Sequence, residues 1–255
     1  MDLGLDGRAY LVTGASRGLG LAAAEYLVAD GADVVLASRD ATDIAAAASK
    51  LDRQGPGTAH GVAADLADPG AAAYLVEEAL DRFGRLDGAV VSVGGPPAAS
   101  MRDTTDEQWR AAFESIHLGP LRLAREVLET ADQPAAVTLV LSTSVRAPVE
   151  GLAISNGLRP GLAMAAKTLA DEYGPLGHRV NVVLPGRIDT ARVQQLDAAT
   201  GDAEAAQRHY AGLIPLGRYG RPEEFGAVVA FVTSPMASYL TGSAVTVDGG
   251  LTRTL

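Results

Sequence analysis

Ser155 and Arg159 lie four residues apart near the start of an alanine-rich stretch, residues 154–174, whose composition is typical of a buried helix. Residues four apart on a helix share one face, one turn from each other. A guanidinium remains charged in proteins, so Arg159 facing a cleft needs a ribose, a phosphate or a carboxylate as its partner. A serine hydroxyl is a weak acid that needs a base beside it. The spacing therefore predicts a small polar site at the mouth of an apolar helix.

A second candidate site lies at residues 13–20, TGASRGLG, where the first apolar run ends and a helical pattern begins. Its glycines allow a tight turn and a close approach of the backbone to a pyrophosphate, and the following helix offers free N–H groups. We interpret this loop as a dinucleotide-binding turn, the alternative being a plain strand-to-helix connection. The candidate cofactor-binding residues here are Gly14, Ser16, Arg17, Gly18, Leu19 and Gly20.

The end of the second apolar run indicates which dinucleotide binds. An NAD site places a carboxylate there to hold the ribose 2′-hydroxyl. The corresponding position is Ser38, and Arg39 follows it, while Arg17 adds a second cation nearby. Two guanidiniums and no carboxylate suit a 2′-phosphate, so NADP(H) is favoured over NAD(H), the alternative being two solvated surface arginines. Asp40 fits better as the first residue of a helix.

The elements that position these residues alternate along the chain. Short runs rich in Val, Leu and Ala predict buried strands at residues 8–14, 32–38, 57–65, 86–94, 135–143 and 178–186, and a last short strand at 243–250. Helical patterns occupy residues 19–30, 41–54, 69–84, 105–130, 154–174 and 221–235. Continuously apolar strands between helices are typical of a parallel sheet that is covered on both faces. We therefore expect one doubly wound α/β domain over residues 1–255.

Composition excludes several classes of function. The chain has 255 residues with a formal net charge of −10, which argues against nucleic acid as a partner. It has no cysteine, so thiolate chemistry and cysteine-based metal sites are excluded, and no metal site is expected. The N-terminus shows no signal-peptide pattern, and no apolar stretch reaches the length of a membrane span, about 18 residues. We expect a cytoplasmic protein that acts on a small molecule.

Four motifs together resemble the short-chain dehydrogenase/reductase family: the glycine loop, Asp65 in VAADLAD, PGRIDT at 185–190 and YLTGSAVTVDGG at 239–250. The resemblance covers essentially the whole chain and implies a Rossmann domain with a seven-stranded parallel sheet. It also implies that Asp65 contacts the adenine, that Thr190 meets the nicotinamide carboxamide, and that residues 188–213 form a mobile lid. The further cofactor-binding residues are then Leu66, Gly94, Pro185, Gly186, Ile188 and Arg159.

The family's chemistry rests on an Asn, a Ser and a Tyr-x-x-x-Lys pair, and this chain departs from that pattern. Aligned on the helix at 154–174, the Tyr position is Ser155 and the Lys position is Arg159. The family's serine precedes the Tyr by thirteen residues, which gives Ser142, and the Asn position is His117. The resemblance therefore makes Ser142, Ser155, Arg159 and His117 the candidate catalytic residues of a divergent member that lacks the Tyr–Lys pair.

Three functions are compatible with these substitutions. In the first, an NADP(H)-dependent oxidoreductase interconverts a carbonyl and an alcohol: Ser142 and Ser155 polarise the carbonyl, and His117 or water supplies the proton. In the second, the scaffold catalyses a non-redox elimination, isomerisation or cyclisation, with His117 as the acid and base. In the third, the chain is a nucleotide-binding subunit without turnover. We expect the first.

Further residues suggest the substrate and the assembly. Arg146 and Arg187 are expected to border the pocket, which favours an anionic or strongly polar substrate. His209 and Tyr210 fall in the expected lid, where a tyrosine could replace the missing phenol. Segments 105–131 and 153–173 carry apolar residues on more than one side, and the resemblance implies a four-helix interface between subunits. We expect a homotetramer or a homodimer.

Overall fold

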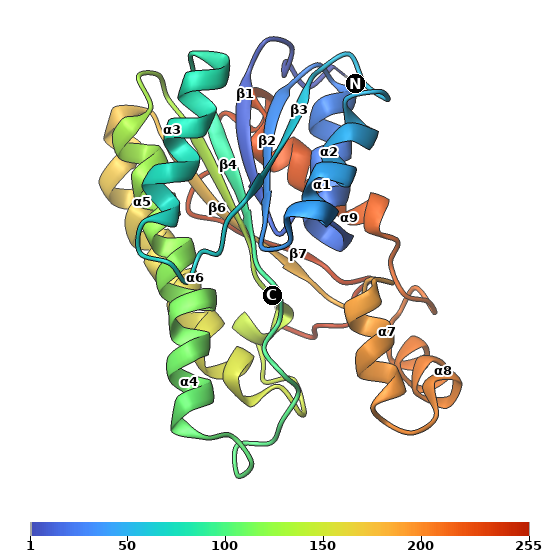
Figure 1. Ribbon diagram of the computed structural model, residues 1–255. Helices are drawn as coiled ribbons and strands as arrows, with labels where there is room; N and C mark the ends of the chain where they lie inside the picture. The colour runs from blue at the N-terminus through green and yellow to red at the C-terminus, as the bar shows by residue number, and fades with distance from the viewer. Residues whose placement is uncertain (1, 255) are drawn as a thin grey trace.

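The computed structural model describes residues 2–254. Seven strands form one parallel sheet in the order β3-β2-β1-β4-β5-β6-β7 (Figure 1). The prediction of a seven-stranded parallel sheet is confirmed. The strands are β1 (Ala9–Thr13), β2 (Asp33–Ser38), β3 (Ala59–Ala63), β4 (Gly88–Ser92), β5 (Ala136–Val140), β6 (Arg179–Pro185) and β7 (Ala244–Val247).

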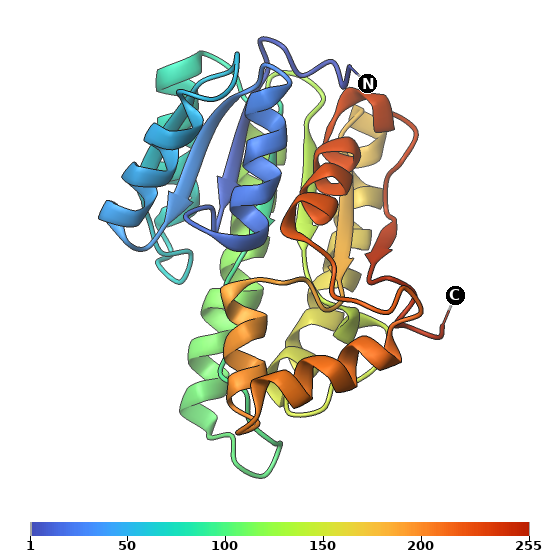
Figure 2. The same cartoon turned by 90° about the vertical axis from the view of Figure 1, so that its right-hand side faces the viewer.

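Helices connect successive strands and cover both faces of the sheet (Figures 1 and 2). On one face, α3, α5 and α6 pack against the strands and bury residues such as Leu75, Leu123 and Leu162. On the other face, α1, α2 and α9 bury Leu27, Ile44 and Phe225. The principal helices are α1 (Gly18–Ala29), α2 (Ala41–Leu51), α3 (Ala71–Phe83), α5 (Gly119–Thr130), α6 (Ala153–Tyr173) and α9 (Pro222–Thr233).

Alternation along the strands explains why both faces are buried. In β1, the side chain of Leu11 joins the core on the α3 side, while Tyr10 and Val12 join the core on the α1 side. Successive side chains of a strand point to opposite faces, so only a run of apolar residues can fill two cores. This is why the strands were recognisable as continuous apolar runs.

The segment 105–130, expected as one helix, is helical throughout but changes its winding. It consists of α4 (Asp106–Ala112), a π-helical stretch η1 (Phe113–Leu118) and then α5. A π-helical turn takes an extra residue into the helix and is often found at functional sites. His117 lies in this stretch.

Two helices stand beyond the carboxyl edge of the sheet, within the segment expected to be a lid. They are α7 (Ala191–Ala198) and α8 (Ala203–Leu213), and both project away from the layered body (Figures 1 and 2). Strand order runs outward in opposite directions from β1 and β4, and in open α/β sheets the ligand-binding crevice lies at the carboxyl edge where the order reverses in this way. Within residues 2–254, no helix is long and apolar enough to cross a bilayer.

Candidate active site

The glycine loop lies at the carboxyl end of β1, beside the crevice. Gly18 has a φ of +63°, a conformation that other residues rarely adopt. A Cβ on Gly20 would lie 2.5 Å from the Gly14 carbonyl oxygen, so the loop packs too closely for a side chain. Arg17 is the N-cap of α1, and its side chain makes no capping hydrogen bond. The first N–H groups of α1 are therefore not capped by that side chain, as a phosphate-binding helix N-terminus requires.

The segment after β6 forms the opposite wall of the crevice. It carries Pro185, Gly186, Ile188 and Thr190, four of the predicted cofactor-binding residues. The Thr190 methyl group lies 3.8 Å from where a Cβ on Gly18 would be. The Thr190 hydroxyl accepts a hydrogen bond from the Val193 amide and so begins α7. The structure thus brings together two predicted sites that are far apart in the sequence.

The residues expected near the adenosine ribose lie at the end of β2. Arg39 and Arg17 are both exposed, and neither makes an ion pair within residues 2–254. Asp40 caps α2, where its carboxylate accepts hydrogen bonds from the amides of Thr42 and Asp43. Asp40, the carboxylate that directly follows Arg39, therefore caps the helix, as expected.

Three further predicted cofactor residues follow the ends of β3 and β4. Asp65 is exposed and accepts a hydrogen bond from the Ala67 amide, while Leu66 is buried behind it. Gly94 is exposed, and a Cβ placed on it would meet nothing within 4 Å. All three residues therefore lie at the same carboxyl edge as the glycine loop.

Two buried hydroxyl groups meet where α6 begins. The Ser155 Oγ lies 3.2 Å from the Ser144 Oγ, and both side chains are buried. Ser142, the serine predicted from the family spacing, instead accepts a hydrogen bond from the Ser144 amide and caps a short 3-10 turn, η2 (Thr143–Val145). The structure thus pairs Ser155 with Ser144, a residue that the thirteen-residue spacing missed. A catalytic role for Ser142 stays a prediction.

Arg159 is buried one turn after Ser155. Its Nη1 donates to the carbonyl oxygens of Val140 and Leu141 at the end of β5, at 3.2 and 2.9 Å. Burial, together with the nearby charge of Arg192, lowers the pKa of Arg159 to about 10. At neutral pH the guanidinium is still charged, and within residues 2–254 no carboxylate pairs with it. The expectation that Arg159 binds a ribose, a phosphate or a carboxylate stays a prediction.

His117 packs against the same helix from the π-helical stretch. Its Nδ1 lies 3.2 Å from the Leu158 carbonyl oxygen, and since a carbonyl only accepts, Nδ1 carries the hydrogen. The imidazole stacks on Phe113, and a Cβ on Gly161 would lie 3.3 Å from its Cε1. Within residues 2–254 it makes no direct hydrogen bond to Ser144 or Ser155. Its predicted role as acid and base therefore requires a bridging water or a movement.

Arg187, which was expected to border the pocket, is paired with a carboxylate. Its Nη1 forms an ion pair of 2.5 Å with Asp197, which also accepts a hydrogen bond from the Tyr219 hydroxyl. The guanidinium lies 3.4 Å from the centroid of the Tyr210 ring. These contacts attach α7 and α8 to the segment after β6. Arg146 is exposed, and its Nη2 donates to the Ala244 carbonyl at 3.4 Å.

A cation that sequence reasoning missed lies at the crevice instead. Arg192 projects from the first turn of α7, and its Nη2 donates to the Pro96 carbonyl. A Cβ on Gly95 would lie 3.1 Å from its Nε. Its place directly after PGRIDT was visible in the sequence, but no local pattern shows that it reaches the loop after β4.

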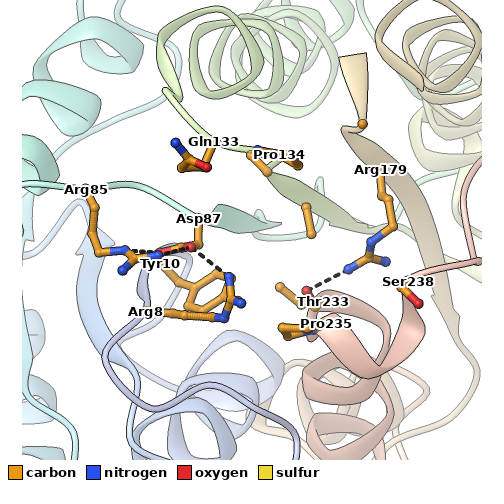
Figure 3. A pocket seen from close by; sticks show the side chains of 13 residues that line it. Arg8, Tyr10, Arg85, Asp87, Gln133, Pro134, Arg179, Thr233, Pro235 and Ser238 are labelled. Atoms are coloured by element: carbon orange, nitrogen blue, oxygen red, sulfur yellow. Dashed lines mark hydrogen bonds and ion pairs between the residues drawn. The ribbon is translucent and has the colours of Figure 1, made fainter. Parts of the chain in front are cut away.

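A pocket of about 390 Å³ lies at the amino edge of the sheet, opposite these residues (Figure 3). Its cations are already engaged: Arg8 and Arg85 both bind Asp87, and Arg179 donates to the carbonyl oxygens at the end of α9. These bonds hold the strand starts and the α9 terminus together. We assign this pocket no part in the chemistry.

Comparison with known proteins agrees with this arrangement. The family profile described as enoyl-(acyl carrier protein) reductase matches residues 14–252. The short-chain reductase protein NovJ of Streptomyces niveus is 33% identical over 94% of this chain and 92% of its own. Cyclohexanol dehydrogenase of a Rhodococcus species is 31% identical over 98% of both chains.

A solved structure extends the similarity to three dimensions. L-Sorbose reductase of Gluconobacter frateurii, in complex with NADPH and L-sorbose, superposes with a TM-score of 0.93 over 100% of both chains at 30% identity. Three observations point to the same family: the strand order, the glycine loop and the matches that span the whole chain. The protein therefore belongs to the short-chain dehydrogenase/reductase family, and it is an oxidoreductase of that family.

Proposed function

We propose that this protein is an NADP(H)-dependent oxidoreductase that interconverts a carbonyl and an alcohol on a small polar substrate. The observation that carries the proposal is the buried pair of hydroxyl groups, Ser144 and Ser155, at the carboxyl edge beside Arg159. A bound nicotinamide would supply or accept the hydride. The chain's own residues would bind and orient the substrate and polarise its carbonyl group.

The residues at the crevice fit a dinucleotide. The uncapped N-terminus of α1 would hold the diphosphate, since its N–H groups and positive dipole suit an anion. Asp65 would bind the adenine, and Thr190 the carboxamide. Gly94 leaves open space along the path between them.

Arg17 and Arg39 support NADP(H) over NAD(H). Both are exposed at the edge where the adenosine ribose would lie, and Asp40 is occupied as a helix cap. A 2′-phosphate would give these guanidiniums charge-assisted hydrogen bonds, while a bare 2′-hydroxyl would find no free carboxylate.

In the reaction, the hydroxyl pair would bind the substrate oxygen. Of two hydroxyls in contact, one donates to the other, and the second keeps its hydrogen for the carbonyl oxygen. Because both are buried, the negative charge that develops on that oxygen is stabilised more strongly than it would be in water. Ser142 remains a candidate for the same role.

Arg159 would supply positive charge and bind ribose hydroxyls. Its Nη1 is held by the two carbonyl oxygens at the end of β5, which fixes the direction of the guanidinium. A guanidinium does not readily release a proton, so it cannot serve in a relay as a lysine ammonium can. A proton would reach the serines from solvent or through His117, whose Nδ1 is engaged and whose Nε2 remains for exchange.

The experiment that tests the proposal has two stages. Calorimetric titration with NADPH and with NADH measures cofactor choice, and we expect clearly tighter binding of NADPH. Arg39→Asp should weaken NADPH and favour NADH, while Arg53→Asp, an exposed arginine on the turn after α2, serves as the matched charge control. A panel of ketones and aldehydes is then screened for consumption of NADPH absorbance.

The outcomes separate the three functions. Carbonyl-dependent oxidation of NADPH supports the reductase. Turnover of a substrate with the redox state of the cofactor unchanged would support a non-redox enzyme. Binding of cofactor without any turnover, together with a partner chain, would support a nucleotide-binding subunit.

We also propose that the chain forms a homotetramer, with a homodimer as the alternative. Large apolar side chains are exposed on the two helical segments expected at the interface, including Phe113 and Met164, which are 41% and 68% exposed. Sedimentation equilibrium measures the number of subunits. Met164→Glu should shift the protein toward a smaller species if α6 is buried between subunits.

A further inference from the structure

Two guanidiniums lie near the carboxyl edge of the sheet, and no carboxylate pairs with either within residues 2–254. Arg159 is buried in α6, and Arg192 is partly buried at the start of α7. Their charges interact, because the charge of Arg192 adds to the effect of burial in lowering the pKa of Arg159. The pKa of Arg192 is itself lowered by burial.

Arg192 reaches across the crevice from the expected lid to the loop after β4. Its Nη2 donates to the buried Pro96 carbonyl, and its Nε lies against Gly95, where a Cβ would be 3.1 Å away, a tight contact. Within residues 2–254, Nη1 and Nε have no hydrogen-bond partner. The guanidinium is thus anchored at one nitrogen and offers the other two as donors.

This arrangement is unfavourable without an anion. Removing a cation from water costs free energy unless it is paired, and two like charges in one cleft raise that cost. Asp197 and Asp189 lie on the same segment as Arg192, but Asp197 binds Arg187 and Tyr219, and Asp189 accepts from Gln194. The charges of Arg159 and Arg192 are therefore available to an anionic ligand.

We propose that Arg192 is a specificity-determining residue that binds a carboxylate of the substrate, in a crevice made positive by Arg159. This inference rests on the proposed function, because it names the substrate class of the same site. Nη2 carries two hydrogens, so the one not given to Pro96 can pair with an N–H of Nη1 or Nε and match the two oxygens of a carboxylate in a fork geometry. The substrate is then a keto acid or the corresponding hydroxy acid.

The position of Arg192 favours the substrate over the cofactor diphosphate as the anion. The guanidinium lies on the loop after β4, and its charge acts on Arg159 at the end of β5. The diphosphate would have its own site at the N-terminus of α1, where Arg17 makes no capping hydrogen bond. The side of the crevice toward β5 holds the hydroxyl pair, which is where a substrate carbonyl would bind.

The test uses the full-length protein saturated with NADP⁺ and a panel of 2-, 3- and 4-oxo acids with their methyl esters. Binding is measured by calorimetry and by the shift in melting temperature, so neither measurement needs turnover. We expect at least one acid to bind about 10- to 100-fold more tightly than its ester, because only the acid forms charge-assisted hydrogen bonds. Arg192→Gln should abolish the difference, and Arg192→Lys should restore part of it.

The effect of substituting Arg192 on cofactor affinity shows whether this residue binds the substrate carboxylate or the cofactor diphosphate. Arg192→Gln should leave the Kd for NADPH nearly unchanged. The matched control is Arg208→Gln, an exposed lid arginine that pairs with Glu204 and should alter neither affinity. If Arg192→Gln weakens NADPH strongly while acids and esters bind alike, Arg192 binds the diphosphate and the proposal is wrong. It is also wrong if the wild-type complex binds no acid better than its ester.

The same experiment distinguishes failure of this inference from failure of the proposed function. If NADPH and NADP⁺ do not bind at all, the proposed function fails. Titration of the acids into the cofactor-free protein then still measures whether Arg192 holds a carboxylate.

Discussion

The Oγ atoms of Ser144 and Ser155 lie 3.2 Å apart, although the residues are eleven positions apart in the sequence. The contact joins the short 3-10 turn after β5 to the first turn of α6. Ser155 stands where the family is expected to carry its tyrosine, and Ser144 lies two residues after Ser142, the expected position of the family serine. The reaction proposed above depends on this pair, so the pair is the first target for substitution.

Ser144→Ala and Ser155→Ala should each lower kcat/KM for carbonyl reduction by about 100-fold, the effect typical of losing one donor to a developing oxyanion. The free energy of unfolding should change by only about 1 kcal/mol, since one modest hydrogen bond is lost. Steady-state kinetics and urea unfolding measure the two effects. Ser142→Ala decides between the serines: a larger loss of kcat there than in Ser144→Ala would make Ser142 the catalytic residue.

Gly157 and Gly161 lie one turn apart on α6 and receive side chains from the neighbouring helical segment. A Cβ on Gly157 would lie 2.5 Å from Trp109 Cη2, so Gly157→Ala should destabilise the protein by about 1–3 kcal/mol through overpacking. Gly161→Ala should instead displace the His117 ring and lower kcat with a smaller change in stability. Urea unfolding and steady-state kinetics measure these effects.

Gly174→Ala is the control for both glycine variants. Gly174 follows α6 with helical φ and ψ, and a Cβ there would meet nothing within 4 Å. The free energy of unfolding of the Gly174→Ala variant should stay the same or rise, because alanine is favoured over glycine in helical conformation. A loss in Gly174→Ala equal to that in Gly157→Ala would contradict the overpacking explanation.

The contact of Asp197 with Arg187 and Tyr219 should hold α7 and α8 against the body. Asp197→Asn leaves the largely buried Arg187 guanidinium without its carboxylate and should cost about 3 kcal/mol in local stability. Limited proteolysis should then cut residues 188–213 faster than in the wild type. Tyr219→Phe, which removes one hydrogen bond, should have a smaller effect.

Tyr239→Phe serves as the control for the lid variants, since Tyr239 is fully exposed. It should leave the rate of cleavage unchanged. If Asp197→Asn is cut no faster than Tyr239→Phe, the ion pair does not hold these helices in place.

His178 should make stability fall as the pH falls below 6.5. Its Nδ1 accepts a hydrogen bond from the Ala135 amide, which only the neutral ring can do, and burial lowers its pKa from 6.5. The unfolded chain therefore binds a proton first, so the stabilisation is complete above the unfolded pKa and is lost as the pH falls toward the folded one. Urea unfolding at about pH 7 and at about pH 5, on either side of the reference value, measures the loss.

His178→Asn keeps an acceptor for the Ala135 amide but cannot titrate, so its stability should depend less on pH. Some dependence should remain, because burial also lowers the pKa of His60. His209→Asn, on an exposed position of α8, should behave as the wild type. If the stability of His178→Asn depends on pH as strongly as that of the wild type, His178 is not the cause of the loss at low pH.

The sequence alone determined the elements and their order. The apolar runs correctly predicted seven strands, and the five inner ones are buried because a strand covered on both faces needs apolar side chains at successive positions. The prediction that the third strand is buried was wrong, since β3 lies at an edge of the sheet and only one of its residues is buried. It also showed that Ser155 and Arg159 share a face of α6, because helical spacing is local. The glycine loop was recognisable for a similar reason, since Gly18 and Gly20 meet backbone constraints within one short segment.

The tertiary structure alone decided which distant residues meet. The 3-10 turn after β5 brings Ser144 rather than Ser142 to Ser155, which a count of residues could not show. Asp197 pairs with Arg187, whereas Arg192 reaches the loop after β4 and has no carboxylate partner within residues 2–254. Local patterns follow from the repeat of backbone hydrogen bonds and from burial. Contacts between segments depend on the path of each loop and on which side chain that path places within bonding distance of each charged group.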